Sequence, residues 1–159
     1  MQPIVTLTSD LGEQEPNVAT IKGVLFTNCP RVQIVDLTHD ITCRQLAEGA
    51  LFIASAAPFF PPGTIHLVTV ASGPAPIAAK IHDQYYVCSN NGVLSLLCDR
   101  YEVECVRAIA IPDALANRAG QIFFGREVFA PAAAALASGA SIEDLGPAMD
   151  ELHRAQLPR

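Results

Sequence analysis

Residues 6–24, TLTSDLGEQEPNVATIKGV, join a short apolar strand to a helix through an acidic turn. The apolar pattern predicts a strand over Ile4 to Thr8 and a helix over residues 17–28. Asp10 therefore stands where a strand ends and the connection to a helix begins. In an open α/β sheet, ligands bind in the crevice beyond the carboxyl ends of the strands, so Asp10 is a candidate ligand-binding residue. The alternative is an N-cap or an Asx turn, the commoner role of an Asp in such a turn.

The rest of the chain continues the alternation of apolar runs with amphipathic stretches. Residues 65–70 (IHLVTV) form a near-continuous apolar run, which is typical of a central parallel strand covered on both faces. Further strands are predicted over residues 33–37, 77–81, 84–88 and 104–109, and further helices over residues 44–57, 93–100 and 128–138. This order predicts a single α/β domain, residues 1–159, with a mostly parallel β-sheet sandwiched between helices.

Turns are predicted from residue types at three places. Pro58 and the Pro61-Pro62-Gly63 turn should stop the helix over residues 44–57. His82-Asp83 separates two predicted strands. Asn90-Asn91-Gly92 is a strong turn signal, because Asn and Gly tolerate the positive φ that tight turns require. Backbone geometry therefore explains both asparagines.

The composition excludes several classes of protein. The chain has 159 residues, of which 50% are hydrophobic and 16% charged, and its mean hydropathy is +0.30. So few charged residues favour buried subunit contacts. A net charge of -6 without any Lys/Arg cluster argues against a nucleic-acid-binding surface. With no 18-residue apolar run and no signal-peptide pattern, we expect a soluble, cytoplasmic protein that does not bind membranes.

The cysteines and histidines do not predict a metal site. The five cysteines lack CxxC spacing, and free, mostly buried thiols are the expected state. The four histidines form no HxxxH pair and no C-x2-C…H pattern. We therefore expect neither a structural metal nor a cofactor.

Six motifs in fixed order carry a family resemblance: SDLG…KG, VDLTHDI, EGA, FFPPGTIHLV, NNGVLSL and GREVFAPAAAALASG. From about residue 4 to about residue 150, the chain resembles the N-terminal domain of the S-adenosylmethionine hydrolase (adenosine-forming) family and its fluorinase and chlorinase relatives. The resemblance implies displacement of methionine from C5′ of S-adenosylmethionine by water or a halide. The leaving group is a neutral thioether, so the protein mainly has to hold the ribose, exclude water and position the nucleophile.

The resemblance also implies a substrate-binding set. Asp10 falls on the aspartate that grips the ribose hydroxyls, where a carboxylate accepting from two vicinal hydroxyls forms a charge-assisted pair. Glu15 and Asn17 fall on positions that can face the ribose, with solvated turn residues as the alternative. Phe123 keeps an apolar wall of the pocket.

Departures from the family put turnover in doubt. Family hydrolases orient or activate water with an Asp in a DPGVG-like turn, an Arg a few residues on, and a His in an FHGR-like segment. The sequence instead holds Ala71, a shortened segment Ala75-Pro76-Ile77 without arginine, and Phe124. The halide-contacting hydroxyls of the halogenases would fall near Pro74 and on Gly125. We therefore assign no catalytic residue, and enzymatic activity stays uncertain.

Other residues of the motifs receive structural interpretations. His39 matches a family histidine, and a structural His bonded to Asp36 or to the backbone is favoured over a general base. Lys22-Gly23 is expected to allow close packing of the first helix. Glu127, at the start of the last long helix, suits the helix dipole.

Two function classes follow. One is S-adenosylmethionine hydrolysis or a related C5′ displacement. The other is a catalytically inactive relative that binds a nucleoside such as S-adenosylmethionine or adenosine, or serves in assembly. Family enzymes continue into a second, β-rich domain, and Arg159 ends this chain where that domain would begin, so half of the usual pocket is expected to be absent. The apolar composition and the family's trimers lead us to expect a homo-oligomer, with a trimer as the first candidate.

Overall fold

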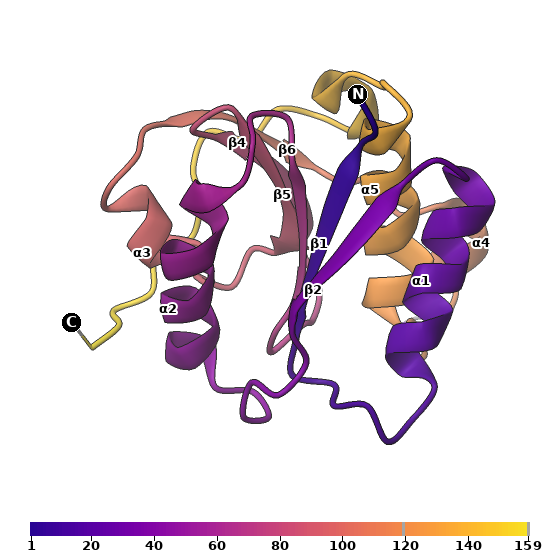
Figure 1. The fold of residues 1–159 in the computed structure, drawn as a ribbon, viewed down its shortest axis with the longest axis horizontal. Helices are drawn as coiled ribbons and strands as arrows, with labels where there is room; N and C mark the ends of the chain where they lie inside the picture. The colour runs from indigo at the N-terminus through magenta and orange to yellow at the C-terminus, as the bar shows by residue number, and fades with distance from the viewer. Residues whose placement is uncertain (119, 159) are drawn as a thin grey trace.

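The computed structural model describes residues 1–118 and 120–158 (Figure 1). The strands are β1 Ile4–Ser9, β2 Gln33–Thr38, β3 Ile65–Thr69, β4 Pro76–Ile81, β5 Gln84–Ser89 and β6 Val103–Ala108. The α-helices are α1 Asn17–Asn28, α2 Leu46–Ala56, α3 Ser95–Cys98, α4 Asp113–Ala116 and α5 Ala130–Ala137. Two 3-10 turns, η1 Ala57–Phe59 and η3 Ile142–Leu145, and a π-helical turn, η2 Gly125–Phe129, complete the list. The α/β class predicted from the sequence is confirmed.

The strands form one mixed sheet in the order β2-β1-β3-β5-β4-β6. Three of its five strand pairs are parallel, and the two that involve β4 are antiparallel. The predicted mostly parallel sheet is thus only partly matched. β3 lies between parallel neighbours with every residue buried, as the apolar run of residues 65–70 predicts.

The tight turn between β4 and β5 decides the direction of β4. His82 and Asp83 have φ of 53° and 58° and connect strands that pair from Ile81 and Gln84 onward. Positive φ at both central residues is the geometry of a two-residue hairpin turn whose twist matches the strands. Because only antiparallel strands can be joined so tightly, this turn forces β4 against the direction of β5.

Helices cover both faces of the sheet. In Figure 1, α1 and α5 lie on one side of the sheet and α2 and α3 on the other. Each face has its own core of buried side chains. Leu7, Leu25, Leu67 and Phe129 belong to the first core, while Ile53, Val68 and Leu97 belong to the second.

Several helix boundaries differ from the sequence prediction. The predicted helix over 93–100 is reduced to α3, and η1 extends past Pro58 after α2 ends. The predicted helix over 128–138 begins as a π-helical turn, in which the Ala130 N–H donates to the Gly125 carbonyl five residues back. Pro131 lies in the first turn of α5 and has no N–H to offer, which favours the wider turn before it. Neither α4 nor η3 was predicted, because neither carries an apolar period.

Residues 1–118 and 120–158 contain neither a membrane-spanning helix nor a cluster of metal-binding side chains. None of the helices described there combines the length and the apolar character that crossing a bilayer requires. That part of the chain also contains no group of three or more His, Cys, Asp or Glu side chains placed to hold a metal ion.

Gly146→Ala is expected to destabilise the domain, whereas Gly23→Ala is expected to stabilise it. A Cβ at Gly146 would lie 1.9 Å from the Ala108 carbonyl oxygen, where the chain returns to pair with β6. Relieving that overlap must shift backbone, at a cost of about 1–3 kcal/mol. A Cβ at Gly23 would meet nothing within 4 Å, and Ala gains about 0.8–1 kcal/mol over Gly inside a helix. Urea unfolding of both variants measures the difference, and equal midpoints would contradict it.

Candidate functional site

Asp10 bridges two loops at the carboxyl ends of the central strands. It directly follows β1, and its N–H donates to the Thr69 carbonyl of β3 at 3.3 Å. Its Oδ2 accepts from the backbone N–H of Arg44 at 2.9 Å and of Ala71 at 3.0 Å. Within residues 1–118 and 120–158, no donor bonds the other carboxylate oxygen, Oδ1. One oxygen of Asp10 therefore organises the loops, and the other is free to accept from a ligand.

The local alternatives for Asp10 are wrong. Pro16 takes the N-cap position of α1, and no side chain caps that helix. The partners of the Asp10 carboxylate lie 34 and 61 residues away in sequence, so its bonds are not those of an Asx turn. Arg44 and Ala71, which both donate to Asp10, have φ of 60° and 49°. The left-handed region is unfavourable for such residues, and the Asp10 carboxylate helps to stabilise it at both.

A cavity of about 410 Å³ opens beside Asp10. Each of the four residues predicted to bind substrate lines it: Asp10, Glu15, Asn17 and Phe123. The sequence prediction missed other lining residues, which come from the loop after β2, from the end of β3 and the loop that follows it, and from the segment before η2. These are Cys43, Arg44, Thr69, Ser72 and Ile122. The tertiary structure thus brings the predicted set together and adds polar groups to it.

Glu15 and Asn17 lie side by side at the rim of the cavity. The Asn17 amide donates to Glu15 Oε2 at 3.2 Å. Glu15 is exposed and Asn17 is half-buried, so both combine a cavity-lining position with contact to solvent. The ligand-facing and solvated interpretations of these residues therefore both fit the geometry.

Phe123 forms one wall of the cavity and is held from both sides. The Arg126 guanidinium carbon lies 5.1 Å from the centre of the Phe123 ring, within cation–π range. The Glu127 carboxylate accepts the Phe123 N–H at 2.8 Å and pairs with Arg118 at 2.9 Å. These bonds, first the one from Phe123 and then those from Arg118, lower the pKa of Glu127. Ala71 and Phe124 line the same cavity, so the positions where the resemblance expects an Asp and a His also meet there.

The loop after β3 is fixed by side chains of the neighbouring turn. The Asn91 amide donates to the carbonyls of Val70 at 3.0 Å and Ala71 at 3.2 Å. Ser89 Oγ both accepts from and donates to the backbone of Gly73 at 3.0 Å. Asn91 therefore does more than shape its own turn. The NNG motif signals the turn but carries no information about this distant contact.

Two buried hydroxyls in the cavity wall have no partner among the described residues. Thr69 Oγ1 and Ser72 Oγ make no hydrogen bond within residues 1–118 and 120–158. A buried hydroxyl without a partner is costly. The cavity therefore combines a free carboxylate oxygen with an aromatic wall, and two unpaired hydroxyls lie buried within that wall.

Comparison with known proteins places this chain in a family. Residues 5–146 match the family described as the SAM hydroxide adenosyltransferase N-terminal domain. The chain belongs to this family. An (R)-S-adenosyl-L-methionine hydrolase from Thermus thermophilus is 35% identical, over 99% of this chain and 66% of the relative. One from Salinispora arenicola is 32% identical, over 98% and 61%, and a fluorinase from an Actinoplanes species is 30% identical, over 99% and 62%.

Solved structures agree with the sequence relatives. An uncharacterized conserved protein from Thermotoga maritima superimposes with a TM-score of 0.89 at 29% identity, over 98% of this chain and 62% of the other. A conserved hypothetical protein from Thermus thermophilus gives a TM-score of 0.80 at 32% identity, with the same coverage. This member of the SAM hydroxide adenosyltransferase family thus spans about three-fifths of the length of most of these relatives.

His39 lies next to the Asp10 cavity in this family member and is held by side chains on both ring nitrogens. His39 Nε2 lies 2.7 Å from Asp36 Oδ1, and His39 Nδ1 lies 2.6 Å from Ser9 Oγ. The predicted bond between His39 and Asp36 is confirmed. Lys22 does not serve close packing as predicted, because Gly23 faces open space; instead Lys22 Nζ bonds Asp36 Oδ2 at 2.6 Å. Partial burial raises the pKa of Asp36, but hydrogen bonds from Lys22 and His39 outweigh it and lower that pKa.

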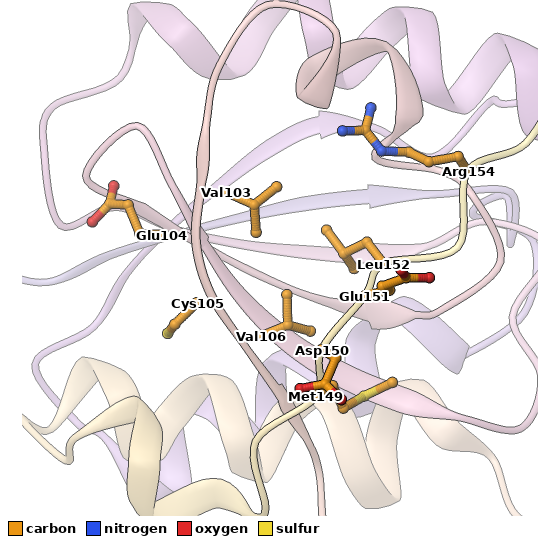
Figure 2. A pocket seen from close by; sticks show the side chains of 9 residues that line it. All are labelled: Val103, Glu104, Cys105, Val106, Met149, Asp150, Glu151, Leu152 and Arg154. Carbon is orange, nitrogen blue, oxygen red and sulfur yellow. The ribbon is translucent and has the colours of Figure 1, made fainter.

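A second hollow, of about 520 Å³, lies far from Asp10 along the edge strand β6 (Figure 2). Figure 2 shows Val103, Val106 and Leu152 around it, with Glu104 and Arg154 on opposite sides. Glu104 is already paired with Lys80 at 2.8 Å and accepts the Asp83 N–H at 2.8 Å. Its carboxylate is thus committed to the β4–β5 turn, and none of the sequence-predicted site residues lines this hollow.

Proposed function

We propose that this domain binds a nucleoside, S-adenosylmethionine or adenosine, in the Asp10 cavity. The single observation that supports it most is the convergence of Asp10, Glu15, Asn17 and Phe123 on one cavity. The named activities of the relatives, S-adenosylmethionine hydrolase and fluorinase, favour this ligand class. Asp10 Oδ1 would accept from the ribose hydroxyls while Oδ2 keeps the two loops in place.

We further propose that binding is not followed by efficient hydrolysis. Ala71 and Phe124, at two of the three water-activating positions of the resemblance, offer no proton acceptor to a water in the cavity. His39 cannot replace them, because Ser9 and Asp36 occupy both of its ring nitrogens. Asp10 would itself be engaged with the ribose. The domain would then act as a nucleoside-binding relative of working enzymes.

Asp10→Asn is expected to weaken adenosine binding strongly. The amide oxygen of Asn can still accept from Arg44 and Ala71, so the loops persist while the charge that would grip the ribose is lost. Losing a charge-assisted pair costs about 1.5–3 kcal/mol, a roughly ten- to hundredfold loss of affinity. Isothermal titration calorimetry with adenosine measures the change, and Asp10→Ala should lose at least as much.

Asp150→Asn is the matched control for this test. Asp150 is exposed and lines the hollow beside β6 rather than the Asp10 cavity, so its substitution changes net charge equally without touching the proposed contact. We expect adenosine affinity to stay within about twofold of the parent, as for most surface substitutions. Equal affinity of parent and Asp10→Asn, or no adenosine binding by the parent at millimolar concentration, would refute the proposed site.

We also propose that the chain self-associates, with a trimer as the first candidate. Phe26, Leu51 and Phe59 are 50%, 57% and 89% exposed, which leaves large apolar side chains on the surface. Burying them between subunits would remove that surface from water. Light scattering at micromolar concentration should give a mass above the 16.9 kDa of one chain, and a clean monomer would exclude the proposal.

A further inference from the structure

Hydrogen bonds link four side chains in a series that runs from the surface to the backbone beside Asp10. It begins at Lys22 on α1, passes through Asp36 on β2 and His39 after β2, and ends at Ser9, the last residue of β1. Its three links measure 2.6, 2.7 and 2.6 Å, which are short for protein hydrogen bonds. Ser9 and His39 are buried, at 2% and 5% exposure, while Lys22 and Asp36 keep contact with solvent.

The direction of each hydrogen bond in this chain follows from the chemistry of its members. The Asp36 carboxylate has oxygens that only accept, so it receives one bond from Lys22 and one from the Nε2–H of His39. When the imidazole of His39 carries a single proton, on Nε2, its Nδ1 is an acceptor. In that tautomer the Ser9 hydroxyl donates to Nδ1. The lone pairs of Ser9 Oγ then face other donors.

Ser9 and His39, at the buried end of this series, hold the backbone on both sides of Asp10. Ser9 Oγ accepts the Leu11 N–H at 3.4 Å. The His39 carbonyl accepts the Gly12 N–H at 2.9 Å, and the Ser9 carbonyl accepts the Ile41 N–H at 3.4 Å. The residues that flank Asp10 are thus hydrogen-bonded to members of this series. The Asp10 carboxylate itself bonds none of the four side chains.

We propose that Lys22, Asp36, His39 and Ser9 form a positioning relay for the Asp10 carboxylate. The relay holds the end of β1 against the loop after β2, so that Asp10 Oδ2 meets the N–H groups of Arg44 and Ala71 and Oδ1 faces the cavity. Its members are positioning residues and touch no ligand themselves. The consequence for nucleoside affinity rests on the proposed function, whereas the consequence for the Asp10 hydrogen bonds does not.

Ser9→Ala and Thr6→Val form a matched pair for the test. Thr6 lies on the same strand and makes a comparable buried bond, between its Oγ1 and His66 Nδ1 at 2.7 Å, but it lies four residues before Asp10. Amide hydrogen exchange in the ligand-free protein reports on the Arg44 and Ala71 N–H groups directly. In Ser9→Ala we expect these two amides to exchange about tenfold faster relative to the amides of β5. That factor corresponds to the loss of one hydrogen bond of ordinary net strength. Thr6→Val should leave that ratio unchanged.

Asp36→Ala tests the relay near its solvent-exposed end. It replaces Ser9→Ala in the exchange experiment if Ser9→Ala does not fold. Asp36 is exposed and its carboxylate bonds Lys22 and His39 rather than Asp10, so faster exchange at Arg44 and Ala71 in this variant can only be transmitted. An unchanged exchange ratio in both relay variants, or an equal change in Thr6→Val, would overturn the proposal.

Adenosine titration separates the relay from the proposed function. Ser9→Ala should bind adenosine about five- to tenfold more weakly than the parent, and the same substitution should have no effect in an Asp10→Asn background, because the relay acts through Asp10. A parent that binds no adenosine while the exchange ratios change as expected would refute the nucleoside site and leave the relay standing. A parent that binds, with an equal loss from Ser9→Ala in both backgrounds, would refute the relay.

Discussion

The purified chain is expected to convert S-adenosylmethionine to adenosine and methionine at a rate close to the uncatalysed background. Water at neutral pH is a poor nucleophile, and a well-placed base typically contributes about 10²–10⁴-fold. Ala71 and Phe124 line the cavity at two of the positions where the resemblance expects the water-orienting groups, and the shortened segment Ala75-Pro76-Ile77 supplies no arginine. Asp10 would be engaged with the ribose, and Glu15 lies at the exposed rim of the cavity, bonded to the Asn17 amide.

Chromatographic detection of adenosine over time measures this rate. The (R)-S-adenosyl-L-methionine hydrolase from Thermus thermophilus, a 35% identical relative, is the positive control under the same conditions. The prediction would be contradicted if adenosine accumulated in proportion to the amount of protein and if Asp10→Ala produced none. The chain would then be an active hydrolase.

Acidification from about pH 7 to pH 4 is expected to remove about 3 kcal/mol of stability through His66 alone. His66 lies in β3 with no exposed surface, bonded through Nδ1 to Thr6 at 2.7 Å and stacked on Tyr86 with ring centres 4.8 Å apart. Burial lowers the pKa of His66 from 6.5 to about 4, and a weak bond to Gln84 opposes this only in part.

The sign of the effect follows from which state binds the proton. Between pH 6.5 and about 4 the unfolded chain protonates His66 and the folded chain does not. The stability present above pH 6.5 is therefore lost as the pH falls through this window, at up to about 1.4 kcal/mol per pH unit. Urea unfolding at several pH values measures the slope.

His66→Gln isolates this contribution from those of the carboxylates. The variant is expected to be less stable than the parent at pH 7 but to show a shallower slope between pH 6.5 and 4, by about one proton. His153→Gln, at an exposed position, should keep the parent slope. Equal slopes for His66→Gln and the parent would show that His66 does not titrate as its burial implies.

Much of the fold is predictable because the signals are local. The helix predicted over residues 17–28 is α1, and β1 exceeds its prediction by only one residue, since apolar periodicity and turn residues act over a few positions. The continuous apolar run of β3 identifies a strand buried on both faces. The motif order was enough to predict the family, and Asp10, Glu15, Asn17 and Phe123 were enough to locate the cavity.

Other features of the fold and of the site could not be predicted from local sequence signals. The sequence marks the His82-Asp83 turn, yet its left-handed φ values, and with them the reversal of β4, became evident only in the folded chain. No pattern indicated that Thr69 and Ser72 would lie in the cavity wall without partners. Their environment depends on which segments pack beside them.

The sequence by itself determined the class of fold, the family and the residue types at the site. Only the tertiary structure decided what those residues do to one another. Asp10 meets Arg44 and Ala71 from 34 and 61 positions away, and the relay joins Lys22 to Ser9 through a strand and a loop on another segment. Hydrogen bonds need atoms within about 3 Å in a set direction, and residues distant in sequence reach that geometry only when packing of the sheet and its helices brings the segments together.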